Sequence, residues 1–322
     1  MKDVAAIALF VLVIGAAAVA LDSGVALTFM MMALYATLLA QAWNLLGGFG
    51  GQFSFGHALF FGSGAYVQAI AQLSGGLNAW LALALAVGSA ALVALGVGAL
   101  AFRYGLKGSY FALVTLAFAE VFRIVALSLP FTGGGVGLML PLRASAANLQ
   151  FGSPRGYVLL LLAFVTLALM VTAWLRHSRF GARLQAIRDN EDAARALGIA
   201  PFQVKLAACV LSGAFMGAAG AFYAQAFQYI DPALAFGPTT SVEALLGAIV
   251  GGMGTLWGPV LGALSLHLLS EATRNLFGAL PGINMVIYGS VLVLIVMFMP
   301  RGIAGLGLSV RAFWGRQGAG DD

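Results

Sequence analysis

Charged residues are scarce in this chain, and their scarcity excludes an ordinary water-soluble domain. Of its 322 residues, 61% are hydrophobic and 8% are charged, whereas soluble domains carry about 25% charged residues. No acidic or basic residue occurs between Asp22 and Arg103, an interval of 80 positions. So few charges could not cover a surface in water, so the composition indicates a protein embedded in a lipid bilayer.

Cysteine and lysine are also few, and their positions exclude further classes of protein. The single cysteine, Cys209, cannot form a disulfide within the chain. A P-loop needs a lysine directly after a glycine to reach the phosphates of ATP, but Lys2, Lys107 and Lys205 follow other residues. The histidines in the apolar segments form no ligand cluster. We therefore expect no enzyme activity, metal or cofactor on this chain. We also expect no nucleic-acid partner, because its basic residues cluster in loops.

The hydrophobic residues form long runs that match the thickness of a bilayer. A helix needs about 20 apolar residues to cross the hydrocarbon core, and helices are favoured because lipid offers no water to unpaired backbone groups. The sequence predicts an all-α, polytopic transmembrane helical bundle of about eight to ten spans, with residues 1–322 forming one domain. Some segments are short for full spans, which predicts short or re-entrant helices near residues 240–271. The expected helical segments lie near residues 4–21, 27–46, 53–72, 81–102, 110–129, 157–175, 206–229, 240–252, 259–271 and 283–299.

The basic residues predict the orientation of these spans, because cytoplasmic loops carry an excess of lysine and arginine. Most basic residues fall on the side of the loop 176–205 and the tail 301–322, whereas Arg143, Arg155 and Arg274 fall on the opposite side. We therefore expect this loop, the tail and both chain termini to be cytoplasmic. The loop 130–156 is expected outside.

The loop 176–205 contains the signals of a short helix displayed on the cytoplasmic face. The Asp-Asn pair after Arg188 can cap its N-terminus, and the acidic residues Glu191 and Asp192 suit the positive end of its dipole. Gly198 suits the position after its C-terminus. A second helix is expected just before it, over 178–188. Most connecting loops are shorter than this one, which favours a docking role over a plain surface loop.

Small side chains in this helix, Ala193 and Ala194, would fit a cleft of another protein. We therefore expect the partner to bind there.

Five segments spread in order along the chain form a set: GGFGGQFSFGHALFFGSGAY (47–66), GSYFALVTLAFAEVFR (108–123), FTGGGVGL (131–138), SRFGARLQAIRDNEDAARALGI (178–199) and GGMGTLWGPVLGA (251–263). Together they resemble permeases of the branched-chain amino acid (leucine/isoleucine/valine) importer family, specifically the M-type subunit. The fourth segment resembles the coupling loop of ATP-binding-cassette (ABC) importers, although the Ile-x-Leu-Pro ending that is common in that loop is absent. The resemblance implies an ATPase-coupling loop that includes Arg188, Glu191, Asp192, Ala193, Ala194 and Gly198.

This resemblance also implies a function and partners. The chain would form half of a translocation path for branched-chain amino acids across the inner membrane of a bacterium. A homologous second permease would complete the path, two cytoplasmic ATPase subunits would hold ATP and magnesium, and a periplasmic or other extracytoplasmic binding protein would deliver the substrate. The same architecture could import urea, short amides or other amino acids. A stand-alone channel or proton-coupled carrier is the other class, but the capped cytoplasmic helix has no evident use there.

Polar residues within the apolar segments are candidates for the translocation path, because ionisable groups at membrane depth are costly and usually functional. Glu120 and Arg123 are three positions apart and can pair on one helix face, which favours a structural role for them. Glu243 lies near the outer start of a short span, whose N-terminus it could cap. The residues around the first glycine-rich turn either line a path or bond to the interrupted backbone. They are Asn44, Gln52, Ser54 and His57.

Two glycine-rich turns, 47–50 and 251–254, share the pattern Gly-Gly-x-Gly. Internal repeats with interrupted helices are common near the substrate path of transporters. In a chain with 43 glycines, coincidence explains the match equally well.

The outer loop 130–156 is a candidate contact for the binding protein. It contains Thr132 and Gly133 near its start, and Arg143, which could meet an acidic residue of a partner. A solvated loop charge is the alternative explanation for that arginine.

Overall fold

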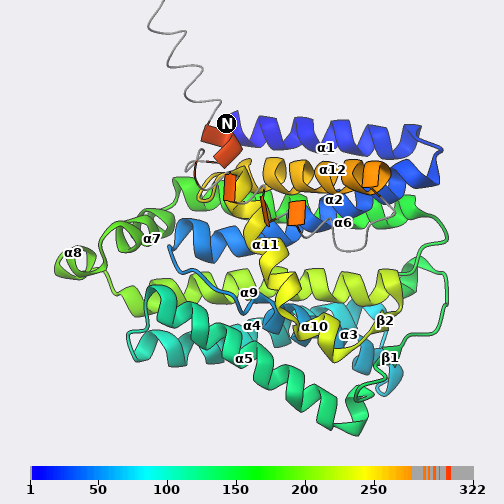
Figure 1. Cartoon of the computed structure of the whole chain (residues 1–322), viewed down its shortest axis with the longest axis horizontal. Helices are drawn as coiled ribbons and strands as arrows, with labels where there is room; N and C mark the ends of the chain where they lie inside the picture. The colour runs from blue at the N-terminus through cyan, green and yellow to red at the C-terminus, as the bar shows by residue number, and fades with distance from the viewer. Residues whose placement is uncertain are drawn as a thin grey trace, which may run out of the picture.

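The computed structural model describes residues 2–277, 286–287, 289–290, 293–294, 297 and 302–305, and these residues form a bundle of helices. Most of the long helices run in the same direction or its reverse in Figure 1, whereas α5 and α11 are inclined to the others. The long helices are α1 (Lys2–Ala20), α2 (Gly24–Trp43), α3 (His57–Leu73), α4 (Ala79–Arg103), α5 (Gly108–Ser128), α6 (Pro154–His177), α9 (Pro201–Phe227), α11 (Pro238–Gly251) and α12 (Gly258–Phe277).

Shorter elements connect the long helices at the two ends of the bundle. The strands pair antiparallel, with Leu138 opposite Ile230, and tie the outer loop to the end of α9. The short elements are the π-helical turn η1 (Asn44–Phe49), the 3-10 turns η2 (Pro130–Thr132) and η3 (Ala146–Asn148), helices α7 (Arg179–Asp189), α8 (Glu191–Ala196) and α10 (Pro232–Phe236), and strands β1 (Leu138–Met139) and β2 (Tyr229–Ile230).

The predicted all-α class and the bilayer-spanning length of the helices are confirmed. Within the described ranges, seven helical segments are long and apolar enough to cross a membrane. Helices α3 and α12 lie beside them, so the number of crossings between eight and ten stays a prediction. The seven segments are Asp3–Ala20, Gly24–Phe49, Ala79–Arg103, Gly108–Ser128, Pro154–His177, Pro201–Phe227 and Pro232–Gly251.

Three predicted boundaries were wrong. The third segment begins at His57 rather than at 53, because the chain is still in an irregular turn before it. The segment expected over 240–252 is longer than predicted, since α10, Gly237 and α11 together cover the 20 residues Pro232–Gly251. The segment expected over 259–271 continues to Phe277. Glu271 and Arg274 end the apolar run, but they pair along the helix at 3.8 Å, and this pairing favours a longer helix. The segment expected over 283–299 lies largely outside the described residues.

The helix ends gather into two groups, and both described ends of the chain lie in the same one (Figure 1). Asp3 in α1 pairs with Arg176 and His177 at the end of α6, at 3.1 and 2.9 Å. Near the other terminus, Gly302 packs against Gly252, where an added Cβ would lie 2.5 Å from the Gly252 nitrogen. We call this end of the bundle, which also carries α7 and α8, the coupling end, and the opposite end the outer end.

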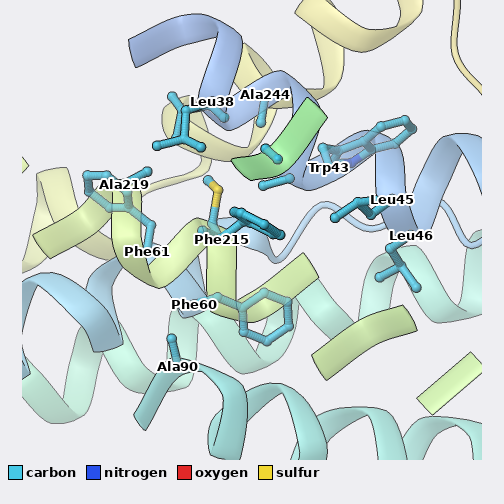
Figure 2. Close-up of a cluster of buried hydrophobic side chains, with 14 of the residues drawn as sticks. Leu38, Trp43, Leu45, Leu46, Phe60, Phe61, Ala90, Phe215, Ala219 and Ala244 are labelled. Atoms are coloured by element: carbon cyan, nitrogen blue, oxygen red, sulfur yellow. The ribbon is translucent and has the colours of Figure 1, made fainter. Parts of the chain in front are cut away.

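The core lies where α3, α4 and α9 pack together, and glycine allows their close approach. A Cβ added to Gly217 of α9 would lie 2.3 Å from the Cβ of Ala90 in α4. A Cβ added to Gly220 would lie 2.0 Å from the Phe61 carbonyl oxygen in α3. Close contact of this kind holds membrane helices together where no hydrophobic driving force is available. Figure 2 shows Phe60 among the side chains that fill the remaining space.

Candidate functional site

Helix α2 loses its regular geometry at the coupling end of the bundle. At Asn44 it passes into the π-helical turn η1, and the chain then bends at Gly51, whose φ is +64°. Side chains bond to the backbone groups that this interruption leaves free. The Trp43 Nε1 donates to the Ser54 carbonyl at 2.9 Å, and the Ser212 hydroxyl donates to the Ala42 carbonyl at 2.7 Å. Interruptions of this kind are frequent at functional sites.

The second glycine-rich turn, residues 252–257 between α11 and α12, lies directly against the first. Asn44 bridges the two, because its Nδ2 donates to the Thr255 carbonyl at 3.0 Å and its Oδ1 accepts from the Gly254 nitrogen at 2.7 Å. Gln41 adds a bond from Nε2 to the Leu256 carbonyl at 2.8 Å. A Cβ on Gly48 would lie 2.5 Å from the Gly254 nitrogen. The two turns therefore form one unit, which we call the paired turns, while their origin as a repeat stays a prediction.

The four candidate path residues around the first turn are buried. His57 Nε2 lies 2.9 Å from the Ser212 hydroxyl, the Ser54 hydroxyl accepts from the Gly56 nitrogen at 3.2 Å, and Gln52 donates to the Gly50 carbonyl at 3.2 Å. Asn44 is occupied by the bridge described above. Each of the four side chains therefore makes at least one bond to a protein group, whereas Gln52 Oε1 and His57 Nδ1 are buried without a hydrogen-bond partner among the described residues.

Glu120 and Arg123 pair on α5 as expected, with Arg123 Nε donating to Glu120 Oε2 at 2.9 Å. Both face away from the bundle, and their side chains are 48% and 29% exposed. The opposite side of α5 holds its buried residues, such as Phe111 and Ala119. An ion pair in the middle of a membrane helix is costly against lipid. The exposed face of α5 therefore suits a protein surface better than a lipid one.

Glu243 does not cap a helix, and the prediction that it does was wrong. Helix α11 begins with Pro238 at its first position and Gly237 as its N-cap, so Glu243 lies in the second turn. The missed signal is this proline, since proline is favoured at the first position of a helix. The Glu243 side chain is exposed. Within the part of the chain that the structure describes, it has no hydrogen-bond or ion-pair partner.

The predicted capped helix is confirmed at the coupling end, where α8 projects beyond the bundle (Figure 1). The Asn190 side chain caps it by accepting from the Asp192 and Ala193 nitrogens at 3.1 and 3.0 Å. Gly198 follows with φ of +81°, a conformation that glycine adopts without strain. The preceding helix α7 matches the one expected over 178–188.

Glu191 anchors α8 to the bundle instead of facing outward. Its carboxylate lies 3.1 Å from Lys205 Nζ, 3.4 Å from Lys107 Nζ and 3.1 Å from the Arg195 guanidinium. The Glu191 and Lys205 side chains are only 11% and 1% exposed. The Lys205 ammonium also lies 4.9 Å from the centre of the Phe102 ring, a cation–π arrangement. This cluster fixes the direction in which the tip of α8 points.

Only part of α8 is open to a partner. Asp192 and Ala193 are exposed, and Leu197 at the C-terminus is 81% exposed. Ala194 is buried, so the expectation that both alanines are presented was wrong for it. A helix of this length has one side against α9, and residues one position apart point to different sides.

Arg188 links α7 to the paired turns. The sequence predicted Arg188 as part of the coupling loop but did not predict this contact. Its Nη1 donates to the Gly48 carbonyl at 2.8 Å. A Cβ on Gly51 would lie 2.5 Å from Arg188 Cγ, and a Cβ on Gly254 would lie 2.9 Å from Arg188 Nη1. One side chain therefore contacts both turns. No local pattern in the sequence could reveal contacts between positions so far apart.

The outer-loop candidates divide into two kinds. Thr132 is buried and its hydroxyl donates to the Leu129 carbonyl at 2.6 Å, while Gly133 has φ of +77°, so the two residues form the end of the turn η2 that follows α5. Arg143 is exposed and borders a cavity of about 320 Å³ at the outer end, together with Gln72 and Asn78. In the described structure its guanidinium has no partner.

Comparisons with known proteins cover most of the chain. A family model described as branched-chain amino acid transport system / permease component matches residues 25–299. The high-affinity branched-chain amino acid transport system permease protein LivM of Salmonella typhimurium is 29% identical over 299 residues, covering 84% of this chain and 68% of that protein. The corresponding LivH protein of Escherichia coli is 25% identical over 289 residues, covering 83% and 90%. The fructose import permease protein FruF of Bifidobacterium longum is 24% identical over 195 residues, covering 60% and 53%. No solved structure matches the chain.

Proposed function

Because this chain belongs to the family of branched-chain amino acid transport system permease components, we propose that it forms half of the translocation path of an ABC importer. Such components are subunits of transporters and not enzymes themselves. The proposed substrates are branched-chain amino acids, since LivM and LivH carry that substrate in their names. A homologous second permease would supply the other half of the path.

The proposed location is the inner membrane of a bacterium, with the coupling end in the cytoplasm. The coupling end carries Arg176 at the end of α6, Arg188 in α7 and Arg195 in α8. Arg155 at the start of α6 and Arg143 in the outer loop lie at the outer end. An excess of basic residues marks the cytoplasmic side of membrane proteins. In this orientation both ends of the chain are cytoplasmic, and α8 points toward soluble partners in the cytoplasm.

We assign α8 as the docking point for an ATPase subunit, and two such subunits would serve the two permeases. ATP and magnesium would bind to those subunits, with no cofactor on this chain. The exposed tip formed by Asp192, Ala193 and Leu197 offers a small apolar surface with one charge. The contact of Arg188 with both paired turns is the observation that carries the proposal. It gives motion of α7 and α8 a direct route to the interrupted end of α2.

The exposed face of α5 is the proposed contact with the second permease. There Glu120 and Arg123 would lie between two proteins rather than against lipid, which lowers the cost of placing charges at membrane depth. A path that runs between the subunits would pass this face. The pair would then act at the edge of the path.

Arg143 and the cavity beside it are the proposed contact with the extracytoplasmic binding protein. The Arg143 guanidinium has no partner within the described ranges, and it suits an acidic residue of that protein. Thr132 and Gly133 would contribute by fixing the end of α5 that borders the outer loop.

Import of urea or short amides by the same architecture is the alternative within this function. A proton-coupled carrier is less well supported, because Arg123 already neutralises Glu120.

The test is uptake of labelled leucine by proteoliposomes that contain this chain with the candidate second permease, ATPase subunits and binding protein. We expect uptake that requires both ATP and the binding protein. Uptake by this chain alone, indifferent to ATP, would instead indicate a channel or carrier. The paired variant Glu191→Arg with Gly198→Pro should abolish both uptake and retention of the ATPase by the complex.

A further inference from the structure

Glu243 lies within a membrane-spanning segment, and its carboxylate has no hydrogen-bond or ion-pair partner among the residues that the structure describes. It lies in the second turn of α11, just past the middle of the 20-residue segment Pro232–Gly251. Three other acidic residues of the long helices do have partners: Glu120 and Glu271 are each paired with an arginine three positions later, and Asp3 is paired with Arg176. An unpaired carboxylate at such a depth is expensive and usually marks a functional position.

The direction of Glu243 follows from its neighbour one turn later. Gly247 packs on α2, where an added Cβ would lie 2.8 Å from the Cβ of Ala40. Residues four positions apart share a helix face, so Glu243 lies on the side of α11 that faces α2. Its side chain is nevertheless exposed. The carboxylate therefore lies among the helices and can still be reached from outside.

Aromatic rings lie beside this carboxylate. Helices α2 and α11 pack side by side, and both run toward the paired turns. Glu243, one turn before Gly247, therefore lies at the level of α2 one turn before Ala40, where Tyr35 lies. The rings of Tyr35 and of Tyr223 on α9 are 6.0 Å apart between centroids, and Tyr35 is also 6.2 Å from Phe222. Tyr223 in turn lies 4.4 Å from Phe227. The surroundings of Glu243 are thus one negative charge and a continuous group of rings.

This combination suits a cation that carries an apolar group. A carboxylate forms strong, charge-assisted hydrogen bonds with an ammonium group, and aromatic faces attract cations as well as apolar surface. An α-amino acid with a branched side chain presents an ammonium and an apolar group within one small molecule. Urea, short amides and sugars have no cationic group to place against the carboxylate.

We propose that Glu243, flanked by Tyr35 and Tyr223, receives the ammonium group of the transported amino acid on its way through the permease. This inference rests on the proposed importer function and adds a substrate-contacting residue to it. It also separates amino acids from the neutral solutes that the same architecture could carry.

The test compares Glu243→Gln with Glu243→Asp in the complete reconstituted complex. Uptake of labelled leucine should fall by about tenfold or more in the glutamine variant, as expected for loss of a hydrogen bond between charged groups. The aspartate variant keeps the charge and should retain most of the uptake. ATP hydrolysis in the presence of unloaded binding protein should be unchanged in both, which shows that the complex is assembled. The matched control is Glu271→Gln, which removes an exposed carboxylate of α12 and should leave uptake unchanged.

A second measurement tests access. Cys209 is buried and is the single cysteine, so Glu243→Cys introduces one reachable thiol. A cationic thiol reagent should modify it in the complex, and leucine with binding protein and ATP should slow that reaction. Wild-type uptake by Glu243→Gln, or a thiol at 243 that does not react, would overturn the proposal. Failure of the wild-type complex to import leucine with ATP would instead overturn the importer function.

Discussion

The guanidinium of Arg188 donates from Nη1 to the carbonyl oxygen of Gly48, 2.8 Å away, and so joins α7 to the interrupted end of α2. The same side chain lies against Gly51 and Gly254. A displacement of α7 cannot leave the paired turns unchanged while this contact holds. Two segments that differ in character, a polar surface helix and a buried turn, are thereby connected by one residue.

Substitution of Arg188 should uncouple ATP hydrolysis from transport. In Arg188→Ala the Gly48 carbonyl loses its charged donor, and we expect leucine uptake to fall about tenfold while ATP hydrolysis continues. Arg188→Lys should restore little, because one ammonium cannot reproduce the planar guanidinium that touches both turns. The measurement is the ratio of leucine imported to ATP hydrolysed. Arg183→Ala, an exposed position of the same helix, is the control. An unchanged ratio in Arg188→Ala would contradict the coupling role.

A methyl group at Gly51 should destabilise the fold by more than backbone strain alone. Gly51 has φ of +64°, and its Cβ would lie 2.5 Å from Arg188 Cγ. Gly76 has φ of +60°, with nothing within 4 Å of its Cβ. Gly76→Ala should therefore show only the strain of a left-handed residue, about 1–2 kcal/mol, and Gly51→Ala a larger loss. Thermal unfolding of the purified protein measures both.

The double variant Gly51→Ala with Arg188→Ala provides a further check. Shortening Arg188 removes the atom that the new methyl group would meet. The loss of stability in the double variant should therefore be close to that of Gly76→Ala. Equal losses in the two single glycine variants would show that the Arg188 side chain yields without cost.

The exposed tip of α8 should determine whether the ATPase is retained. Leu197 is 81% exposed, so Leu197→Asp should leave the fold intact while placing a charge on the apolar docking surface. We expect the ATPase to be lost during co-purification. Val136→Asp is a matched control, because Val136 is 82% exposed at the opposite end of the molecule. Equal ATPase retention in both variants would exclude this docking point.

Charge reversal on α5 should disrupt the pairing of the two permeases. Glu120→Arg places two like charges where Glu120 and Arg123 now pair. We expect weaker co-purification of the second permease with this variant. The exchange variant, Glu120→Arg with Arg123→Glu, keeps the ion pair and should recover most of the association. Normal association and uptake in the single reversal would show that this face does not meet the second permease.

The sequence predicted well those features that depend on neighbouring residues. The Asn190 cap, the Gly198 terminus and the Glu120–Arg123 pair are each set within about one helical turn, and all three are present. The length of α10 and α11 was underestimated, because Pro238 and the short α10 extend the span beyond its most apolar part.

By itself the amino-acid sequence determined that this protein lies in a membrane, that it is all-helical and that a capped helix leaves the bundle, because composition and local spacing decide these properties. Only the tertiary structure decided which of its polar residues meet. Arg188 reaches a carbonyl 140 positions away, and Asn44 a carbonyl 211 positions away. Contacts over such separations depend on how glycine and alanine faces let whole helices approach one another, and no local pattern specifies that packing.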